Sequence, residues 1–290
     1  MRRKKKANSL RRGLPQPVQS DEPRLLPTPP EPWLPDTQQT TPDMTASPKK
    51  TWLIVGASRG IGHEFVRQLL VRGEKVYATV RNPSGEHQSS FWTGHEDVDP
   101  PCTVFSCDVL NEQSLLNLAS NIKAQGTRID HVVINAGVLK YPNRASEVSY
   151  EDFAFHLHSN TIGPIICAQR LLSSGVGIGA ITFISSDSGS AQQFRQFEDG
   201  FAAYAASKAA LNQMARHLAA ELERKGSKTV ILLLHPGEVM TDMAKIEVEW
   251  DMGDQLTPEE SVSGCLKRIE SKSQIDSGSF WTWENKRYPW

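Results

Sequence analysis

The sequence predicts an α/β protein with a doubly wound, seven-stranded, mostly parallel sheet and helices on both faces. Two observations support this fold class. From Thr51 onward, short apolar runs alternate with longer helix-like patterns, and several of the longer patterns begin at a cap-like Asn, Ser or Thr. Because alternating β and α units place neighbouring strands parallel, the helices are expected to cover both faces of one sheet.

Seven strands and five helices follow from this pattern. The expected strands are 51–56 (TWLIVG), 75–80 (KVYATV), 102–107 (CTVFSC), 130–136 (DHVVINA), 179–185 (GAITFIS), 228–234 (KTVILLL) and 278–283 (GSFWTW). The expected helices are 61–72, 111–125, 149–172, 203–225 and 257–270. With no fixed-period repeat and no linker inside this region, residues 51–290 are expected to form one domain.

Residues 1–50 differ in composition from the rest. They begin with a basic stretch and continue with a segment rich in Pro, Thr and Gln, which cannot bury enough apolar surface to offset its ordering entropy. We expect this extension to be disordered. Two further interpretations of residues 1–43 stay open: a nuclear or organelle address, or a dispensable segment upstream of a start at Met44.

Composition excludes several classes of partner. The chain has 32 Lys plus Arg against 33 Asp plus Glu, so no overall field favours nucleic acid or a membrane surface. Its four cysteines have no metal-ligand or disulfide-framework spacing, and its eight histidines form no HExxH motif. No apolar run approaches the roughly 20 residues of a membrane span. The sequence therefore predicts a soluble cytoplasmic protein with a small-molecule partner and no metal.

The stretch IVGASRGIGHEF combines a strand end, a glycine-rich turn and a helix start. Gly56, Gly60 and Gly62 lack β-carbons, so backbone N–H groups around Ser58, Arg59 and Ile61 can approach a phosphate at the positive helix end. This arrangement indicates a dinucleotide site. The alternative is a tight turn whose glycines serve only packing.

The residues that follow the second strand indicate which dinucleotide binds. A carboxylate there would hydrogen-bond the adenosine ribose of NAD, whereas arginine would pair with the 2′-phosphate of NADP. The strand ends YATVRNP, which offers Arg81 and no acid, and Arg59 lies in the glycine turn. These two arginines favour NADP(H); otherwise they are solvated surface charges.

The stretch YAASK places Tyr204 and Lys208 four residues apart in a predicted helix, so both side chains emerge on one face. A free phenol has a pKa of about 10, and an ammonium about 4 Å away would lower it by favouring the phenolate. The pair therefore predicts an acid–base site. The alternative is a helix whose tyrosine faces the core and whose lysine faces solvent.

In this order along the chain, the motifs resemble those of the short-chain dehydrogenase/reductase family, over essentially residues 51–290. The longer stretch between Ser186 and Tyr204, with LTPEES and the terminal FWTWENKRYPW, is similar to its C-factor-like and sniffer-like carbonyl reductase branch. The family turn TGxxxGIG has Val55 here in place of threonine, which loses one hydroxyl contact within the turn. The family motif NNAG has Ile134 in place of its first asparagine. The resemblance implies a single Rossmann-like domain that binds NADP(H).

The resemblance also assigns roles to individual residues. Tyr204 would donate a proton to a substrate carbonyl, and Lys208 would lower the pKa of Tyr204 and bind the nicotinamide ribose. Ser186 would hydrogen-bond the carbonyl oxygen, with Ser185 open as the alternative. Asn160 would hold a relay water. The matching cofactor contacts are Gly56, Ser58, Arg59, Gly60, Ile61, Gly62, Arg81, Asp108, Val109, Asn135, Ala136, Gly137, Tyr204, Lys208, Pro236, Gly237, Val239 and Thr241.

The implied function is reversible, NADPH-dependent reduction of a ketone or aldehyde to the alcohol. A protein of another class, a dinucleotide-sensing or signalling protein that keeps the fold, is the alternative. Family members form homodimers or homotetramers, and the sequence does not choose between these states. Phe194 and Phe197 either line the substrate cleft or pack between loop and sheet, and the loop residues leave the substrate unidentified.

Overall fold

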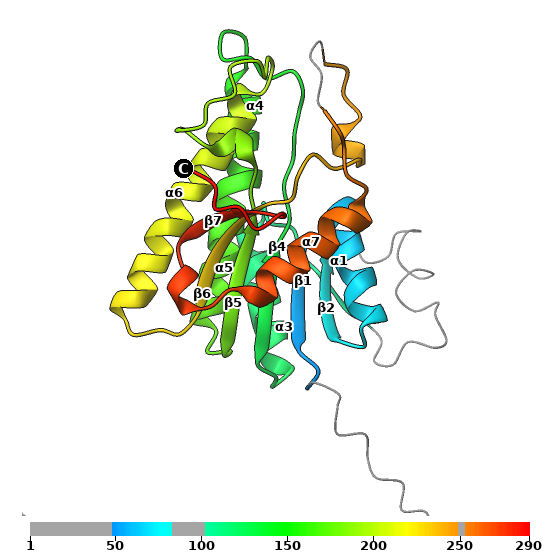
Figure 1. The fold of residues 1–290 in the computed structure, drawn as a ribbon. Helices are drawn as coiled ribbons and strands as arrows, with labels where there is room; N and C mark the ends of the chain where they lie inside the picture. The colour runs from blue at the N-terminus through cyan, green and yellow to red at the C-terminus, as the bar shows by residue number, and fades with distance from the viewer. Residues whose placement is uncertain (1–47, 83–101, 249–252) are drawn as a thin grey trace, which may run out of the picture. The chain divides into compact units, whose positions relative to one another are not determined.

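The computed structural model describes residues 48–82, 102–248 and 253–290; the expectations for residues 1–47 lie outside this part of the chain. The sheet has seven strands in the order β3-β2-β1-β4-β5-β6-β7, and Figure 1 shows it with β3 unlabelled. Every neighbouring pair is parallel, so the sheet is fully parallel where the sequence predicted a mostly parallel one. The predicted fold class is confirmed.

The element boundaries lie within about two residues of those predicted. The strands are β1 Thr51–Val55, β2 Lys75–Val80, β3 Thr103–Ser106, β4 Ile129–Ile134, β5 Ile178–Ile184, β6 Val230–His235 and β7 Ser279–Thr282. The helices are α1 Gly60–Val71, α3 Glu112–Ala124, α4 Tyr150–Leu157, α5 Gly163–Ser173, α6 Ala202–Arg224 and α7 Pro258–Ser271, with short turns η1 His158–Ile162, η2 Asp187–Gly189, η3 Asp242–Ala244 and η4 Gln274–Asp276.

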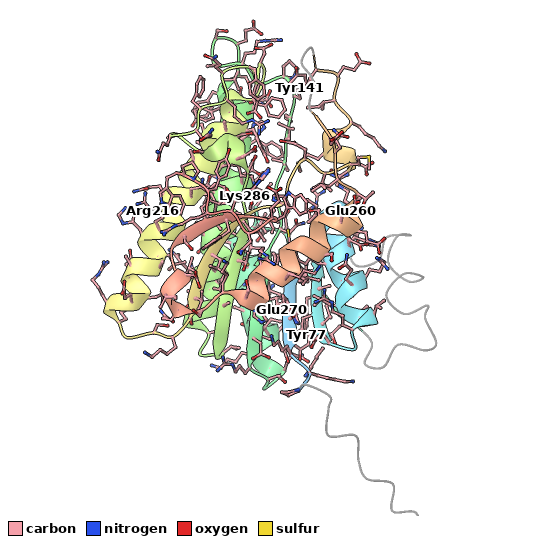
Figure 2. All side chains as sticks on the ribbon, viewed as in Figure 1. Tyr77, Tyr141, Arg216, Glu260, Glu270 and Lys286 are labelled. Carbon is pink, nitrogen blue, oxygen red and sulfur yellow. The ribbon has the colours of Figure 1, made fainter. Side chains whose placement is uncertain are left out.

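Alternating side chains of the strands divide the core into two layers. On β1, Trp52 and Ile54 pack with α1 and α7, whereas Leu53 and Val55 pack with α3, α5 and α6. Tyr77 of β2 is buried in the second layer, while Glu260 on α7 and Arg216 on α6 are exposed on the outside (Figure 2). The sheet is therefore covered on both faces, as its continuous apolar strands require.

The strand order reverses at β1, which pairs with β2 on one side and β4 on the other. In an open parallel sheet, ligands bind beyond the carboxyl ends of the strands at such a switch point. The turns after β1 and β4 carry the predicted cofactor motifs. The topology therefore brings those motifs to one edge.

The predicted helix 149–172 is continuous but not uniform. Its central turn, η1, is π-helical and joins α4 to α5. A side chain at Gly163, where α5 begins, would place its β-carbon 2.5 Å from the Val109 carbonyl oxygen, so the helix passes directly against the loop after β3. π-helical turns within α-helices often occur at functional positions, and this one carries Asn160.

No helix in the described ranges combines the length and apolar character needed to cross a bilayer.

Candidate active site

The glycine turn after β1 is built from close backbone contacts. Gly56 has φ +85°, and a β-carbon there would lie 2.8 Å from the backbone of Ala136. A β-carbon on Gly62 would lie 2.1 Å from the Gly56 carbonyl oxygen, which also accepts a 2.9 Å hydrogen bond from Asn135 Nδ2. Only glycine fits at these two positions, so the turn is locked against the end of β4.

A neighbouring strand supplies a hydroxyl to this turn. The Gly56 N–H donates to Thr79 Oγ1 of β2 at 3.0 Å. Val55, which stands where the family turn has threonine, is instead fully buried in the core layer of α3, α5 and α6. The sequence analysis did not single out Thr79, because a contact between adjacent strands leaves no spacing pattern.

A cleft of about 230 Å³, here called the first cleft, lies at this edge of the sheet. It is lined by most of the predicted cofactor residues: Gly56, Ser58, Arg59, Gly60, Ile61, Arg81, Asp108, Val109, Asn135, Ala136, Gly137, Tyr204, Lys208, Pro236 and Thr241. Gly62 lies behind the turn. Gly237 and Val239 line only a neighbouring cleft, which shares Ile61, Tyr204, Pro236 and Thr241 with the first.

The first cleft suits an anionic ligand. Arg59 and Arg81 are exposed on its wall, and helix α1 points its N-terminus at it with no acidic residue in the first turn and no side-chain cap. Asp108 is engaged locally, because its Oδ1 accepts from the Leu110 N–H at 3.0 Å. Amide groups at a helix N-terminus and two guanidinium groups fit phosphates, so these residues can hold a phosphorylated dinucleotide.

Tyr204 and Lys208 emerge from one face of α6 at the junction with a second cleft. Tyr204 lines both clefts, and Lys208 lines only the first. The buried Lys208 ammonium donates to the Ile184 carbonyl oxygen at 2.9 Å and lies 5.8 Å from the Tyr204 ring centre. Burial lowers the pKa of Lys208 to about 8.

The predicted lowering of the Tyr204 pKa is wrong for this structure. Withdrawal of the phenol from water raises its pKa well above the ordinary value, the negative charges of Glu238 and Glu198 raise it further, and only a hydrogen bond with Ser186 opposes them. Lys208, whose ammonium is bonded to a backbone carbonyl, does not offset this burial. A phenol with a raised pKa stays protonated at neutral pH.

Of the two candidate serines, the structure favours Ser186. Its Oγ contacts Asp187 and the Ser188 N–H at 3.2 Å each and hydrogen-bonds Tyr204. Ser185 Oγ instead donates to Asn212 Oδ1 at 2.6 Å within the core. Ser186 lines only the second cleft, whereas Ser185 lines both. Because its hydroxyl is committed to Asn212, Ser185 is the poorer candidate.

Asn160 is fully buried behind Tyr204 and Lys208. Its Oδ1 accepts from the Val138 N–H at 2.7 Å, and its Nδ2 donates to the Val138 carbonyl at 2.9 Å and to Ser207 Oγ at 2.9 Å. A β-carbon on Gly137 would lie 3.2 Å from Asn160 Oδ1 and 3.5 Å from Lys208 Nζ. Asn160 therefore joins the loop after β4 to α6, beside the lysine.

A second asparagine, Asn143, positions the start of α6 and was not predicted. Its Oδ1 accepts from the N–H groups of Ala203 at 2.8 Å and Tyr204 at 3.1 Å, and its Nδ2 donates to the Lys140 carbonyl. The cap residue of α6, Phe201, makes no side-chain cap bond of its own. Asn143 thus caps the helix from a distant loop, which sequence patterns for local caps cannot reveal.

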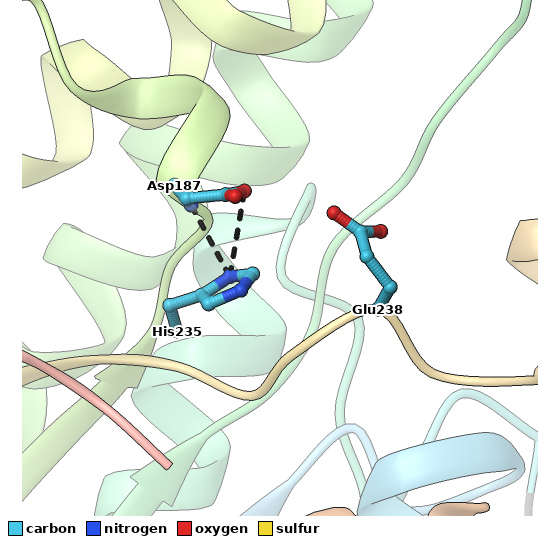
Figure 3. Close-up of side chains that lie close together, drawn as sticks. All are labelled: Asp187, His235 and Glu238. Carbon is cyan, nitrogen blue, oxygen red and sulfur yellow. Dashed lines mark hydrogen bonds and ion pairs between the residues drawn. The ribbon is translucent and has the colours of Figure 1, made fainter. Parts of the chain in front are cut away.

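A charged cluster lies beside Ser186. Asp187, His235 and Glu238 have ligand-type atoms within 4.8 Å of one another (Figure 3). His235 Nδ1 accepts from the Asp187 N–H at 3.2 Å, and burial lowers the pKa of His235 to about 3, so the ring is neutral. Arg195 contacts both Asp187 and Glu238. The Arg195 guanidinium therefore already provides the positive charge that a metal ion would bring to these side chains.

The second cleft is the space in front of Tyr204 and Ser186. It is lined by Ile61, Leu139, Ser185, Ser186, Ser188, Arg195, Glu198, Phe201, Tyr204, His235, Pro236, Gly237, Glu238, Val239, Thr241, Met243, Ala244 and Ile246. Neither Phe194 nor Phe197 is among them: both are exposed, and Phe197 lies 5.0 Å from the Arg195 guanidinium. Phe201 is the aromatic residue of the 187–203 loop that reaches this cleft.

Comparison with known sequences identifies the family. Residues 50–252 match the short chain dehydrogenase model, and the chain belongs to this family of oxidoreductases. An uncharacterized oxidoreductase of Schizosaccharomyces pombe is 30% identical over 258 residues, which span 84% of this chain and 99% of the relative. The C-signal protein of Myxococcus xanthus is 32% identical over 163 residues, 56% of this chain and 93% of the relative.

Solved structures place the chain near carbonyl reductases. The NADPH-bound carbonyl reductase from chicken fatty liver is 29% identical and superimposes with a TM-score of 0.73, over 83% of this chain and 99% of that one. The carbonyl reductase Sniffer of Drosophila melanogaster, 23% identical with a TM-score of 0.71 over 83% and 100%, shares the fold. The predicted resemblance to the C-factor-like and sniffer-like branch is confirmed.

Proposed function

We propose that this protein is an NADPH-dependent carbonyl reductase that converts a ketone or aldehyde to an alcohol. One observation carries the proposal: Tyr204, hydrogen-bonded to Ser186, lies at the junction of a phosphate-compatible first cleft and a second cleft beside it. A carbonyl oxygen that meets both hydroxyls would be next to whatever occupies the first cleft. Two ligands that react with one another must be bound side by side, as these two adjoining clefts would hold them.

NADPH is the proposed occupant of the first cleft. Arg59 and Arg81 line it, the three residues directly after β2 (RNP) include no acid, and the 29% identical chicken carbonyl reductase was crystallised with NADPH. Gly56, Gly60 and the start of α1 would hold its phosphates, Arg81 its 2′-phosphate, and Lys208 and Thr241 its nicotinamide end. When bound, NADPH supplies a hydride to the carbonyl carbon.

The residues of this chain then stabilise and protonate the carbonyl oxygen. Ser186 and Tyr204 hydrogen-bond the oxygen as it gains negative charge, and Tyr204 transfers its proton to it. Lys208 lies behind the phenol to compensate the phenolate that remains. Asn160 fixes the loop–helix contact beside Lys208, and it is the proposed holder of a relay water.

The two arginines that favour NADP(H), Arg59 and Arg81, support reduction as the working direction, because NADPH is the hydride donor. Alcohol oxidation would instead need Tyr204 as a base. The reaction remains reversible in principle. We further propose that the enzyme works in the cytoplasm as a homodimer or homotetramer.

The match to C-signal keeps a second candidate function, a dinucleotide-gated signalling protein. Loss of Asn160, Ser186, Tyr204 or Lys208 would favour it, and all four are present in this chain. Tyr204→Phe separates the two candidates. A reductase loses turnover, while a cofactor-gated partner interaction survives.

The first experiment is a titration of the purified protein with NADPH and NADH, followed by nicotinamide fluorescence. We expect NADPH to bind more tightly, and Arg81→Ala to raise its Kd at least tenfold, since charge-assisted bonds contribute roughly 1.5–3 kcal/mol. Arg224→Ala, an exposed arginine at the end of α6 outside both clefts, is the matched control. The proposal fails if neither nucleotide binds.

Turnover is then measured as NADPH oxidation with 4-nitrobenzaldehyde. Tyr204→Phe should lower kcat by about a thousandfold, because positioned general acids contribute roughly 10²–10⁴. Its Kd for NADPH should stay within about threefold of wild type, which separates lost chemistry from lost folding. An active Tyr204→Phe enzyme would remove the tyrosine from the mechanism.

A further inference from the structure

The second cleft is lined by apolar side chains, here called the apolar wall, and by charged side chains. Ile61, Leu139, Phe201, Val239, Met243 and Ile246 supply apolar surface. Arg195 and Glu198, from the loop between Ser186 and Tyr204, and Glu238, from the segment after β6, supply charge. A bound molecule therefore meets both hydrocarbon and charged groups.

Arg195 is already engaged by carboxylates on all three of its nitrogens. Its Nη1 contacts Asp187, its Nε lies 2.7 Å from Glu198 Oε1, and its Nη2 lies 3.6 Å from Glu238 Oε1. Phe197 covers the guanidinium at 5.0 Å from the ring centre. Three carboxylates therefore surround this one guanidinium.

The cluster carries excess negative charge. Three carboxylates face one guanidinium, and His235 is neutral because its Nδ1 accepts the Asp187 N–H. Asp187 and Glu198 are nearly inaccessible, with side chains 7% and 9% exposed, but the Glu238 side chain is 40% exposed. Glu238 is thus the carboxylate that a ligand can reach.

The pKa shifts of Glu238 and Tyr204 are consistent with an excess of negative charge in the second cleft. Burial raises the pKa of Glu238, and the Glu198 charge raises it further against the effect of Arg195. The charges of Glu238 and Glu198 both raise the pKa of Tyr204, so their field reaches the proposed reacting group. Lys208 lines only the first cleft. A cation in the second cleft would relieve this repulsion, and an anion would increase it.

We propose that the second cleft selects carbonyl compounds that carry a positively charged group, a protonated or quaternary amine, with Glu238 as the residue that contacts the cation. The same charge disfavours carbonyl compounds that carry a carboxylate or phosphate. The inference rests on the proposed reductase function and defines its substrate class. The apolar wall would hold the hydrocarbon part of the substrate.

Three aldehydes of nearly equal size test the selection. They are (4-formylbenzyl)trimethylammonium, its neutral isostere 4-neopentylbenzaldehyde and the anion 4-formylphenylacetate, in which a methylene insulates the carbonyl from the charge. We expect kcat/KM for the cation to exceed that for the neutral aldehyde at least tenfold, and the anion to be the poorest substrate. Wild-type values for all three within threefold, or a preference for the anion, overturn the proposal.

Glu238→Gln locates the effect. The substitution keeps the size of the side chain and removes its charge, so the cation-to-neutral ratio of kcat/KM should fall by about tenfold. Glu223→Gln, an exposed glutamate near the end of α6, should keep the wild-type ratio. An unchanged ratio in Glu238→Gln contradicts the assignment.

A binding measurement separates this inference from the reductase proposal. Benzyltrimethylammonium and phenylacetate lack the aldehyde, and calorimetry on the NADPH-saturated protein measures their affinities directly. If no aldehyde is reduced but benzyltrimethylammonium binds at least tenfold more tightly than phenylacetate, and Glu238→Gln removes the difference, the cleft assignment stands and the reductase proposal falls. Equal affinities overturn the cleft assignment.

Discussion

The two clefts that meet at Tyr204 are built in different ways. The first depends on backbone contacts between turns, where Gly56 and Gly62 permit approaches that no other residue allows. The second depends on long side chains from separate loops, with Arg195 holding Asp187, Glu198 and Glu238 together. A close backbone contact requires glycine at fixed positions in the sequence. The side chains of a cluster, in contrast, can come from positions with many different spacings. This difference explains why the cofactor is predicted more readily than the substrate.

The largest effect is expected from adding one carbon to the first cleft. In Gly62→Ala the new β-carbon would lie 2.1 Å from the Gly56 carbonyl oxygen, so the turn must shift. Overpacking of this kind costs roughly 1–3 kcal/mol. We expect a loss of about 3 kcal/mol in the free energy of unfolding by urea denaturation, with at least a tenfold rise in the Kd for NADPH.

A matched glycine tests whether the effect is local. Gly177→Ala, in the loop before β5, would place its β-carbon 3.6 Å from Arg128 Cγ, an ordinary contact. Its stability and affinity should stay close to those of wild type. If Gly62→Ala behaves like Gly177→Ala, backbone closeness does not control the first cleft, and the contrast between the clefts is lost.

The neutral histidine of the second cleft, His235, should make the free energy of unfolding depend on pH. Burial lowers the pKa of His235 to about 3, from about 6.5 in the unfolded chain. The unfolded state therefore binds more protons below pH 6.5, and stability that is present above this pH is lost as the pH falls towards 3. Linkage gives a loss of about 2 kcal/mol between pH 7 and pH 5 from this side chain.

His235→Asn should remove that dependence. The asparagine Oδ1 can accept the Asp187 N–H in place of Nδ1, so the contact is kept while the titration is lost. Urea denaturation at pH 7 and pH 5 measures the difference in the free energy of unfolding between the two pH values. Burial also lowers the pKa of His131, to about 4, so this histidine contributes a similar pH dependence that remains in the variant. His217→Asn, on the exposed face of α6, is the control. Equal pH dependence in wild type and His235→Asn would show that His235 is not buried as a neutral ring.

Sequence patterns captured the fold and the elements of the first cleft because both depend on local regularities. Alternating apolar runs located the strands, and glycine spacing located the turn after β1. The cap that Asn143 gives to α6 and the hydrogen bond between Ser185 and Asn212 join residues distant in sequence. The Tyr204 pKa was predicted with the wrong sign, since the YxxxK spacing reveals the nearby lysine but neither the burial nor the two glutamates.

The smallest effect concerns the hydroxyl that the glycine turn uses. The sequence interpretation was that Val55, in place of a threonine, leaves the turn one contact short. The structure assigns that contact to Thr79, whose Oγ1 accepts the Gly56 N–H at 3.0 Å. Thr79→Val should therefore cost about 1 kcal/mol and weaken NADPH binding a few-fold. Val55→Thr should bring no gain in affinity, because its hydroxyl would enter the apolar core layer and Gly56 already has an acceptor. Nucleotide titration and urea denaturation of both variants decide the matter: tighter binding in Val55→Thr together with a silent Thr79→Val would restore the sequence interpretation and assign the contact to β1.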